Sequence, residues 1–145
     1  MNKEFWYADG LFRGYKYNQT RLAELKDRLQ AAEARAAGVS SPRIKSEDEA
    51  KYKKSTAPPA DRKIDAIMVR DALKNEIVIM SGKVSHIDDF RNTLTAKLND
   101  VFRLRYEELR SIKDIAIITG VTYQYVSKQL ETIAERFVSW ENKKV

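Results

Sequence analysis

The sequence SIKDIAIITGVTYQYV, at residues 111–126, decides the fold of the C-terminal third of the chain. Ser111 followed three residues later by Asp114 is the acidic form of a capping box, which predicts that a helix begins directly after the serine. Gly120 is suited to the left-handed backbone conformation that ends a helix. Thr122 can cap a further helix. The stretch therefore predicts two helices joined by a three-residue turn.

The apolar residues on both sides of this turn are spaced as a pair of packed helices requires. The inward face of the first helix should consist of Ile112, Ile115, Ala116 and Thr119. The second helix should run from Tyr123 to about Phe137. Its buried stripe, with spacings of four, three and four, should consist of Val126, Leu130, Ile133 and Phe137. Two helices of about eight and fifteen residues with such a turn match the helix-turn-helix pattern, which we therefore expect at residues 100–145.

The candidate functional residues lie at the start of the second helix, the part of a helix-turn-helix unit that enters the major groove of DNA. Together with a lysine of the first helix, they are Lys113, Thr122, Tyr123, Gln124, Tyr125, Ser127 and Lys128. Gln124 can pair bidentately with adenine, and Lys128 can donate to guanine O6 and N7. Serine and tyrosine hydroxyls commonly reach phosphates. Glu131 and Glu135 would repel phosphates, so contacts with double-stranded DNA should be confined to the first two turns.

The net charge of +6 is not concentrated in this region. Residues 100–145 contain eight Lys and Arg against seven Asp and Glu, whereas residues 1–60 contain twelve against eight. Because phosphate attraction supplies most non-specific affinity, the helix-turn-helix domain alone should bind DNA weakly and depend on a dimer or a partner protein. The near balance also leaves open a helical hairpin that contacts only proteins.

The C-terminal third also contains the residue pattern of a known domain. The pattern consists of LRY at 104–106, SIKDIA at 111–116, GVT at 120–122, and Val126, Leu130 and Phe137. It resembles region four of bacterial sigma factors, the domain that reads the promoter −35 element. In that family the bases are contacted from the positions of Tyr123, Gln124, Ser127 and Lys128. Tyrosines and a serine replace the family's arginines, Leu109-Arg110 replaces a glycine-containing turn, and no counterpart of the promoter-melting region two is visible, so a complete sigma factor is not expected.

A helical N-terminal arm followed by a domain of this type, in 145 residues, is similar in layout to phage-encoded late-gene regulators of the ArpU and RinA type. The similarity implies activation of late or packaging genes in the cytoplasm of a bacterial host, with double-stranded DNA and host RNA polymerase as partners. Two alternatives remain open. One is a small terminase subunit or another DNA-packaging protein, and the other is an adaptor that binds RNA polymerase without contacting DNA.

Residues 1–38 are expected to form one amphipathic helix that ends at Gly38. Alternating spacings of four and three form a heptad pattern at Leu11, Tyr15, Asn18, Leu22, Leu25, Leu29, Ala32 and Ala36. These positions can pair within the chain or between two chains in a homodimer. Six of the fourteen aromatic residues lie in the first seventeen positions. We expect their rings to pack on the central helices, with a partner-binding patch as the alternative.

The middle of the chain divides into a linker and a helical region. Residues 39–60, rich in Ser, Pro and charged residues, are expected to form a flexible linker. Residues 61–99 are expected to form one long helix or two consecutive ones, antiparallel to the first helix, with a kink or an end at Ser81-Gly82. Their apolar stripe should consist of Ile64, Ile67, Met68, Ala72, Val78 and Ile79, continued by Ile87, Phe90, Leu94, Leu98, Val101 and Phe102.

The sequence lacks the residue patterns of an enzyme or a metalloprotein. It contains no cysteine and a single histidine, His86, which has no neighbouring carboxylate pair at ligand spacing. No Ser/His/Asp set and no glycine-rich phosphate loop is present, and no apolar run reaches the ~18 residues of a membrane span. We therefore expect a cytoplasmic all-α protein with a helical hairpin or coiled-coil arm and a helix-turn-helix domain, without cofactor, metal or enzymatic activity.

Overall fold

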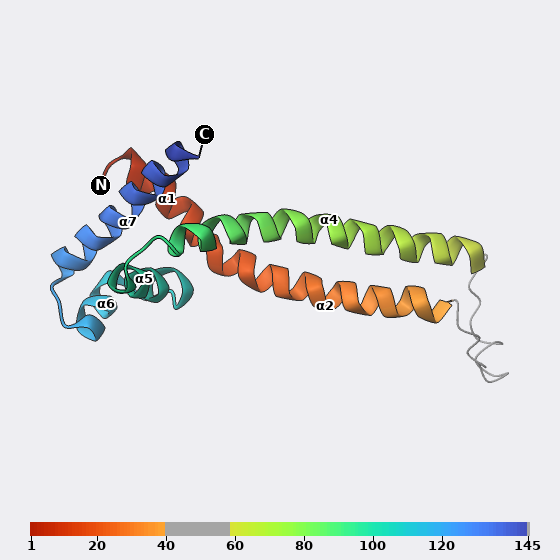
Figure 1. Cartoon of the computed structure of the whole chain (residues 1–145). Coiled ribbons are helices and arrows are strands. Elements are labelled where there is room, and N and C mark those ends of the chain that lie inside the picture. The colour runs from red at the N-terminus through yellow and green to blue at the C-terminus, as the bar shows by residue number, and fades with distance from the viewer. Residues whose placement is uncertain (40–58, 145) are drawn as a thin grey trace. The chain divides into compact units, whose positions relative to one another are not determined.

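A computed structural model describes residues 1–39 and 59–144, and every secondary-structure element in these residues is a helix (Figure 1). The elements are α1 (Lys3–Arg13), α2 (Tyr15–Val39), α4 (Pro59–Arg91), α5 (Ala96–Phe102), the π-helical segment η1 (Arg103–Glu107), α6 (Ile112–Thr119) and α7 (Tyr123–Lys143). The all-α fold is confirmed. The predicted flexible linker, residues 39–60, lies outside the described residues apart from its two ends.

The chain divides into two compact units whose boundaries fall inside α2 and α4. The helix-turn-helix unit consists of Met1–Thr20 and Ser81–Val145, and the hairpin unit consists of Arg21–Met80. The sequence predicts boundaries near residues 38, 60 and 99, at the expected ends of helices. These positions differ from the boundaries between the two units. The backbone hydrogen bonds of a helix continue through the point at which its packing partners change, so this point carries no local signal.

Within the hairpin unit, α2 and α4 run antiparallel side by side, as expected (Figure 1). The heptad face of α2 is turned inward, because Leu25 and Ala32 are buried and the heptad positions between and around them are half-buried. An ion pair spans the two helices, with 3.7 Å between Arg21 Nη2 and Glu76 Oε2. The heptad positions of this unit are therefore covered within the chain.

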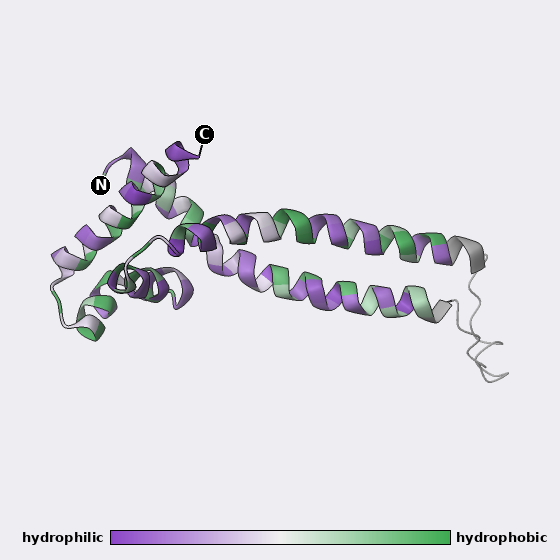
Figure 2. Ribbon diagram, in the orientation of Figure 1, coloured by the Kyte–Doolittle hydropathy of each residue, from purple (hydrophilic) through white to green (hydrophobic). Residues whose placement is uncertain are grey.

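The apolar stripe predicted for the first half of α4 is wrong. Five of its six residues are exposed: Ile64, Met68, Ala72, Val78 and Ile79. Apart from Ile67, the half-buried residues lie on the opposite face with alternating spacings of four and three, and they are Ala66, Arg70, Leu73, Ile77 and Met80. Apolar segments recur around α4 (Figure 2), so hydropathy alone could not identify the inner face. The long aliphatic stem of Arg70 can cover apolar surface at this seam.

The N-terminal region forms two helices instead of the single one expected. α1 ends at Arg13 and α2 begins at Tyr15, with Gly14 in a turn between them. The interruption shifts the buried face by one residue, because Phe12 is fully buried whereas Leu11, a predicted heptad position, is 42% exposed. α1 packs on α7, and a break at a glycine lets α1 follow this partner independently of α2.

The core of the helix-turn-helix unit is a cluster of aromatic rings. The Phe12 ring centroid lies 4.9 Å from that of Phe137 and 5.0 Å from that of Phe102. Phe90 and Tyr106 complete the cluster, which therefore joins α1 to four C-terminal elements. The predicted packing of the N-terminal aromatics on the central helices is correct for Phe12, which contacts Phe90, and for Tyr15, which bonds to Asp88. Phe5 is also buried. The prediction is wrong for three exposed residues, Trp6, Tyr7 and Tyr17.

A buried carboxylate connects α1 to η1. Asp9 is 3% exposed, and its carboxylate accepts hydrogen bonds from Arg13 at 2.6 Å and from the Tyr106 hydroxyl at 2.7 Å. Burial, reinforced by the bond to Asp9, raises the pKa of Tyr106, so the hydroxyl keeps its proton and remains a donor. Tyr15 donates to Asp88 in the same way, and burial together with this bond raises the pKa of Tyr15 to about 12.

The region that leads into the C-terminal helices consists of two consecutive helices, one of the two alternatives expected. α4 does not end at Ser81-Gly82, one of the two outcomes predicted there, but continues to Arg91. Thr95 then caps α5 by accepting a backbone N–H at 3.3 Å. The apolar residues predicted here are buried or half-buried: Ile87, Phe90, Leu94, Leu98, Val101 and Phe102. None of the described helices is both long and apolar enough to cross a bilayer.

Candidate nucleic-acid interface

α6 begins and ends where the sequence predicted. The Ser111 hydroxyl accepts the backbone N–H of Asp114 at 3.1 Å, and Gly120 ends the helix with φ 73°, in the left-handed region. Three residues of the predicted inward face are buried or half-buried, namely Ile112, Ile115 and Ala116. The fourth, Thr119, is exposed at the last turn, where its hydroxyl donates to a backbone carbonyl at 2.7 Å.

α7 also begins at the predicted residue. The Thr122 hydroxyl oxygen accepts the backbone N–H of Tyr125 at 3.1 Å, so the helix starts at Tyr123. All four residues of the predicted stripe are buried, namely Val126, Leu130, Ile133 and Phe137. One side of α7 is therefore held in the core. The opposite side must then face the solvent.

α7 is longer than predicted, since it ends at Lys143 instead of near Phe137. Its last turns have tertiary partners that the stripe did not indicate. The Trp140 ring lies 5.7 Å from the Phe90 ring of α4, and Glu141 Oε2 lies 2.8 Å from His86 Nε2. The single histidine is thus a helix-packing residue. Among the described residues, no group of His, Cys, Asp and Glu could hold a metal ion.

The first two turns of α7 present polar and aromatic side chains to the solvent. Tyr123 is 54% exposed and Tyr125 is 42% exposed. Gln124 and Lys128 are also exposed, whereas Ser127 is half-buried. These five predicted residues therefore lie together on one anchored helix, and we call them the recognition surface.

The two remaining predicted residues have different positions. Thr122 is the N-cap of α7, so its side-chain oxygen is already engaged by a backbone N–H. The cap satisfies one of the first four N–H groups, which have no acceptor within the helix, and the macrodipole adds positive potential there. Lys113 is exposed in the first turn of α6, which packs on α7. No hydrogen bond or ion pair joins Lys113 to the recognition surface in the described part of the chain.

Some of the charged residues of the C-terminal region form ion pairs with each other or with Arg91, and others do not. Glu107 and Glu108 are neutralised by arginines, which are Arg91, Arg103 and Arg110. Lys113 and Lys128 form no ion pair with any described carboxylate. Two of the seven acidic residues of this region are therefore paired with arginines at the end of η1, whereas Lys113 and Lys128 keep their charge for other partners.

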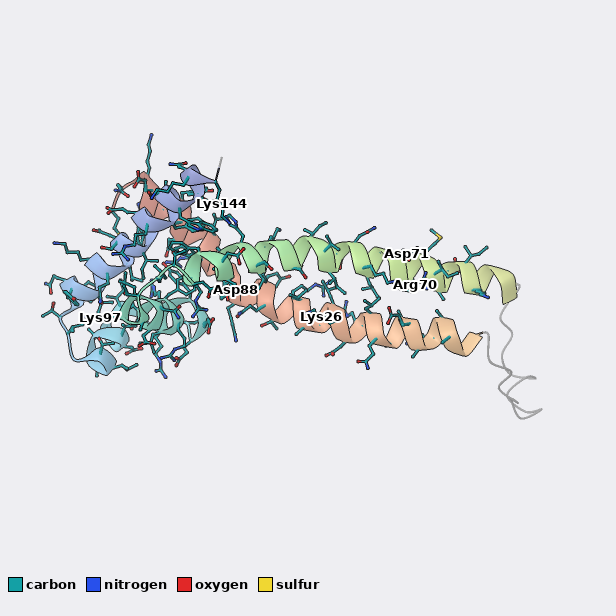
Figure 3. All side chains as sticks on the ribbon, in the orientation of Figure 1. Lys26, Arg70, Asp71, Asp88, Lys97 and Lys144 are labelled. Carbon is teal, nitrogen blue, oxygen red and sulfur yellow. The ribbon has the colours of Figure 1, made fainter. Side chains whose placement is uncertain are left out.

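Lys97 of α5 adjoins the recognition surface and was not predicted. Its Nζ donates to the Tyr125 hydroxyl at 3.0 Å and lies 5.0 Å from the centre of the same ring, as its position beside α7 in Figure 3 illustrates. The two residues are 28 positions apart. The sequence placed α5 in the helical scaffold, and no local pattern connects a scaffold lysine with a tyrosine two helices later.

Two isoleucines of α6, the helix that packs on α7, are also exposed. Ile117 is 71% exposed and Ile118 is 51% exposed. The exposure of Ile117 excludes close packing of its side chain within the described residues. These two residues give α6 an exposed aliphatic patch. The recognition surface contains no aliphatic residue.

Comparison of the chain with known protein families, with characterised proteins and with solved structures finds no match. Similarity to other proteins therefore assigns no family and no function to it. The function has to be inferred from the geometry of the two capped helices and from the side chains that they expose.

Proposed function

We propose that the helix-turn-helix unit binds double-stranded DNA in a sequence-specific manner and that the protein regulates transcription. The observation that carries this proposal is the recognition surface, a group of exposed polar side chains on the first two turns of a capped, anchored helix. In helix-turn-helix proteins this part of the second helix reads the major groove. Because the opposite side of α7 is buried, these side chains are presented in a fixed direction.

The recognition surface contains donors and acceptors for both bases and phosphates. Gln124 can form two hydrogen bonds with adenine, and Lys128 can donate to guanine. The hydroxyls of Tyr123 and Tyr125 and the ammonium group of Lys113 can contact phosphates on either side. Base contacts provide specificity, and phosphate contacts fix the register of the helix on the duplex.

The resemblance of the C-terminal third to region four of sigma factors supports a role at promoters. The layout of the chain supports a phage-encoded activator of late genes that acts with RNA polymerase in a bacterial host. One backbone detail agrees with the resemblance. Leu109 has φ 58°, the left-handed conformation that favours glycine, at the position where the family has a glycine-containing turn.

The proposal is tested by selecting the genomic DNA fragments that the full-length chain binds at a stated salt concentration, followed by footprinting. We expect a sharp class of sites upstream of late genes. Gln124→Ala and Lys128→Ala should each weaken binding to such a site about tenfold or more, since a bidentate base contact contributes about 1–3 kcal/mol. Circular dichroism should show unchanged helix content, because both side chains are exposed.

Matched controls are available on α2 of the hairpin unit. Gln30 and Lys26 are exposed residues of the same two types, and Lys26 is labelled in Figure 3. Gln30→Ala and Lys26→Ala should leave the footprint and the affinity unchanged. Wild-type footprints for both Gln124→Ala and Lys128→Ala would refute the assignment of α7 as the recognition helix.

A second candidate function is an adaptor that binds RNA polymerase without contacting DNA. The exposed Ile117 and Ile118 favour it, because apolar residues grouped on a surface are typical of protein contacts. An adaptor would not shift DNA by itself and would lose polymerase binding with Ile117→Asp. A DNA-packaging subunit would form a ring of many copies, whereas we expect a monomer or a dimer. Any homodimer would have to use a surface other than the covered heptad positions of α2.

A further inference from the structure

A groove of about 300 Å³ lies between α5 and α7, beside the recognition surface. Three cations line it: Lys97 from α5, and Lys128 and Arg136 from α7. None of the described residues that line it is Asp or Glu. Three positive charges that line one groove without a carboxylate create a local positive potential, which the charge balance of the whole region conceals. Lys128 belongs to both surfaces, so the groove continues the recognition surface.

The three cations are not neutralised within the chain. Several arginines of the same unit form ion pairs with acids, but Lys97, Lys128 and Arg136 form none with the described residues. Lys97 is positioned by a neutral partner instead, the hydroxyl of Tyr125 at 3.0 Å. A neutral partner orients the ammonium group and leaves its charge available to an anion.

Gln129 provides a second, independent observation. This residue is only 7% exposed and lines the groove, yet its side-chain amide forms no hydrogen bond with any described residue. No side-chain nitrogen or oxygen among the described residues is both enclosed and unpaired, so the amide of Gln129 is accessible to solvent, and the residue lines the groove. An amide without a partner therefore stands beside three unpaired cations, where it can donate to the same anion.

We propose that this groove binds a phosphate of the DNA backbone next to the major groove that α7 reads, an inference that rests on the proposed DNA-binding function. The non-bridging oxygens of a phosphodiester accept hydrogen bonds from lysine, arginine and amide groups. The contact carries no sequence information. It holds α7 in register on the duplex and supplies part of the attraction that a nearly neutral domain otherwise lacks.

The test is a titration of the full chain with its selected site and with unrelated duplexes over a range of salt concentrations. Lys97→Gln and Arg136→Gln should each weaken binding about fivefold at 0.15 M salt and reduce the slope of log K against log salt by about 1. The loss should be the same for every duplex. The double variant should reduce the slope by about 2.

Gln129→Leu separates the hydrogen bond from the charge. Leucine has a similar size and suits a buried position, so the thermal midpoint should not fall. We expect a severalfold loss of affinity with an unchanged salt slope, because the amide is neutral. Unchanged affinity in this variant would leave Gln129 as a structural residue and would contradict its place in the phosphate site.

Lys83→Gln and Lys143→Gln are the controls, since each removes one charge from an exposed position of the same unit outside the groove. If the wild-type chain binds specifically but Lys97→Gln and Arg136→Gln behave like these controls, the phosphate site is refuted. The proposed DNA-binding function would then still stand. A changed sequence preference in the groove variants would also overturn it, because the groove would then contact bases. Absence of any DNA binding by the wild-type chain would refute both proposals.

Discussion

The two units of the chain bury their apolar residues in different ways. The hairpin unit packs one face of α2 on one face of α4, and the buried side chains among its described residues are Leu25 and Ala32. The helix-turn-helix unit encloses Phe12, which is fully buried, within rings from four other elements. Two helices alone leave most seam residues half-buried, whereas a ring cluster removes whole side chains from water. The recognition surface belongs to the unit whose core can hold it rigid.

The largest effect is expected from the centre of the ring cluster. Phe12→Ala should lower the free energy of unfolding by about 3–5 kcal/mol, because it removes a fully buried ring and leaves a cavity among four other rings. Urea unfolding followed by circular dichroism measures the loss. Trp6→Ala is the control on the same helix. Trp6 is 59% exposed, so this variant should lose less than about 1 kcal/mol. Equal losses would mean that burial in the ring cluster does not stabilise the helix-turn-helix unit.

A smaller effect is expected in the hairpin unit. Leu25→Ala should lower the free energy of unfolding by about 2–3 kcal/mol, the low end for a buried leucine, because a two-helix seam can relax around the gap. Ile79→Ala tests the corrected orientation of α4. Ile79 is 59% exposed, so its truncation should cost about 0.5 kcal/mol or less. An Ile79→Ala loss as large as that of Leu25→Ala would place the originally predicted stripe on the inner face after all.

The same contrast explains which parts of the structure were predictable from the sequence. The caps at Ser111 and Thr122 and the end at Gly120 depend on hydrogen bonds within a few residues, so local chemistry determines them. The stripe of α7 is equally clear because its other faces are polar. The inner face of α4 was not predictable, since α4 has apolar residues on more than one face. Lys97 reaches the recognition surface only through tertiary packing, and no pattern along the chain indicates it.

A third prediction concerns the buried hydrogen bond that joins α1 to η1. Tyr106→Phe should lower the free energy of unfolding by about 1–2 kcal/mol, because Asp9 stays buried and loses one of its two donors. Tyr17→Phe is the control, since Tyr17 is 65% exposed, and it should be neutral. A neutral Tyr106→Phe would show that Arg13 alone satisfies the carboxylate.

The same tyrosine should affect the pH dependence of stability. The pKa of Tyr106 is raised in the folded chain by burial and by Asp9, and that of Tyr15 is raised to about 12. Unfolded tyrosine ionises near pH 10. The folded chain therefore retains protons that the unfolded chain releases, and stability should fall as the pH rises above about 10. Tyr106→Phe should make this alkaline decline less steep, which unfolding at several pH values measures. An unchanged decline would contradict the raised pKa of Tyr106.

The smallest effect is expected where the helix-turn-helix unit carries backbone strain. Leu109 has φ 58°, the left-handed region, and no other described residue except glycine has a positive φ. The Arg110 N–H bonds to the Leu104 carbonyl at 3.0 Å across this turn, so a backbone contact maintains the conformation. Leu109 is 67% exposed, and replacing it therefore removes little packing.

Leu109→Gly should consequently raise the free energy of unfolding by up to about 1 kcal/mol. A non-glycine residue in this region costs roughly 1–2 kcal/mol, and the greater freedom of glycine in the unfolded chain cancels about 0.5–1 kcal/mol of the gain. Leu11→Gly is the control, because Leu11 is exposed within the regular helix α1 and glycine there should cost about 1 kcal/mol. Opposite signs for the two variants would locate the strain at Leu109. A loss of stability in both variants would mean that the backbone at Leu109 is not strained.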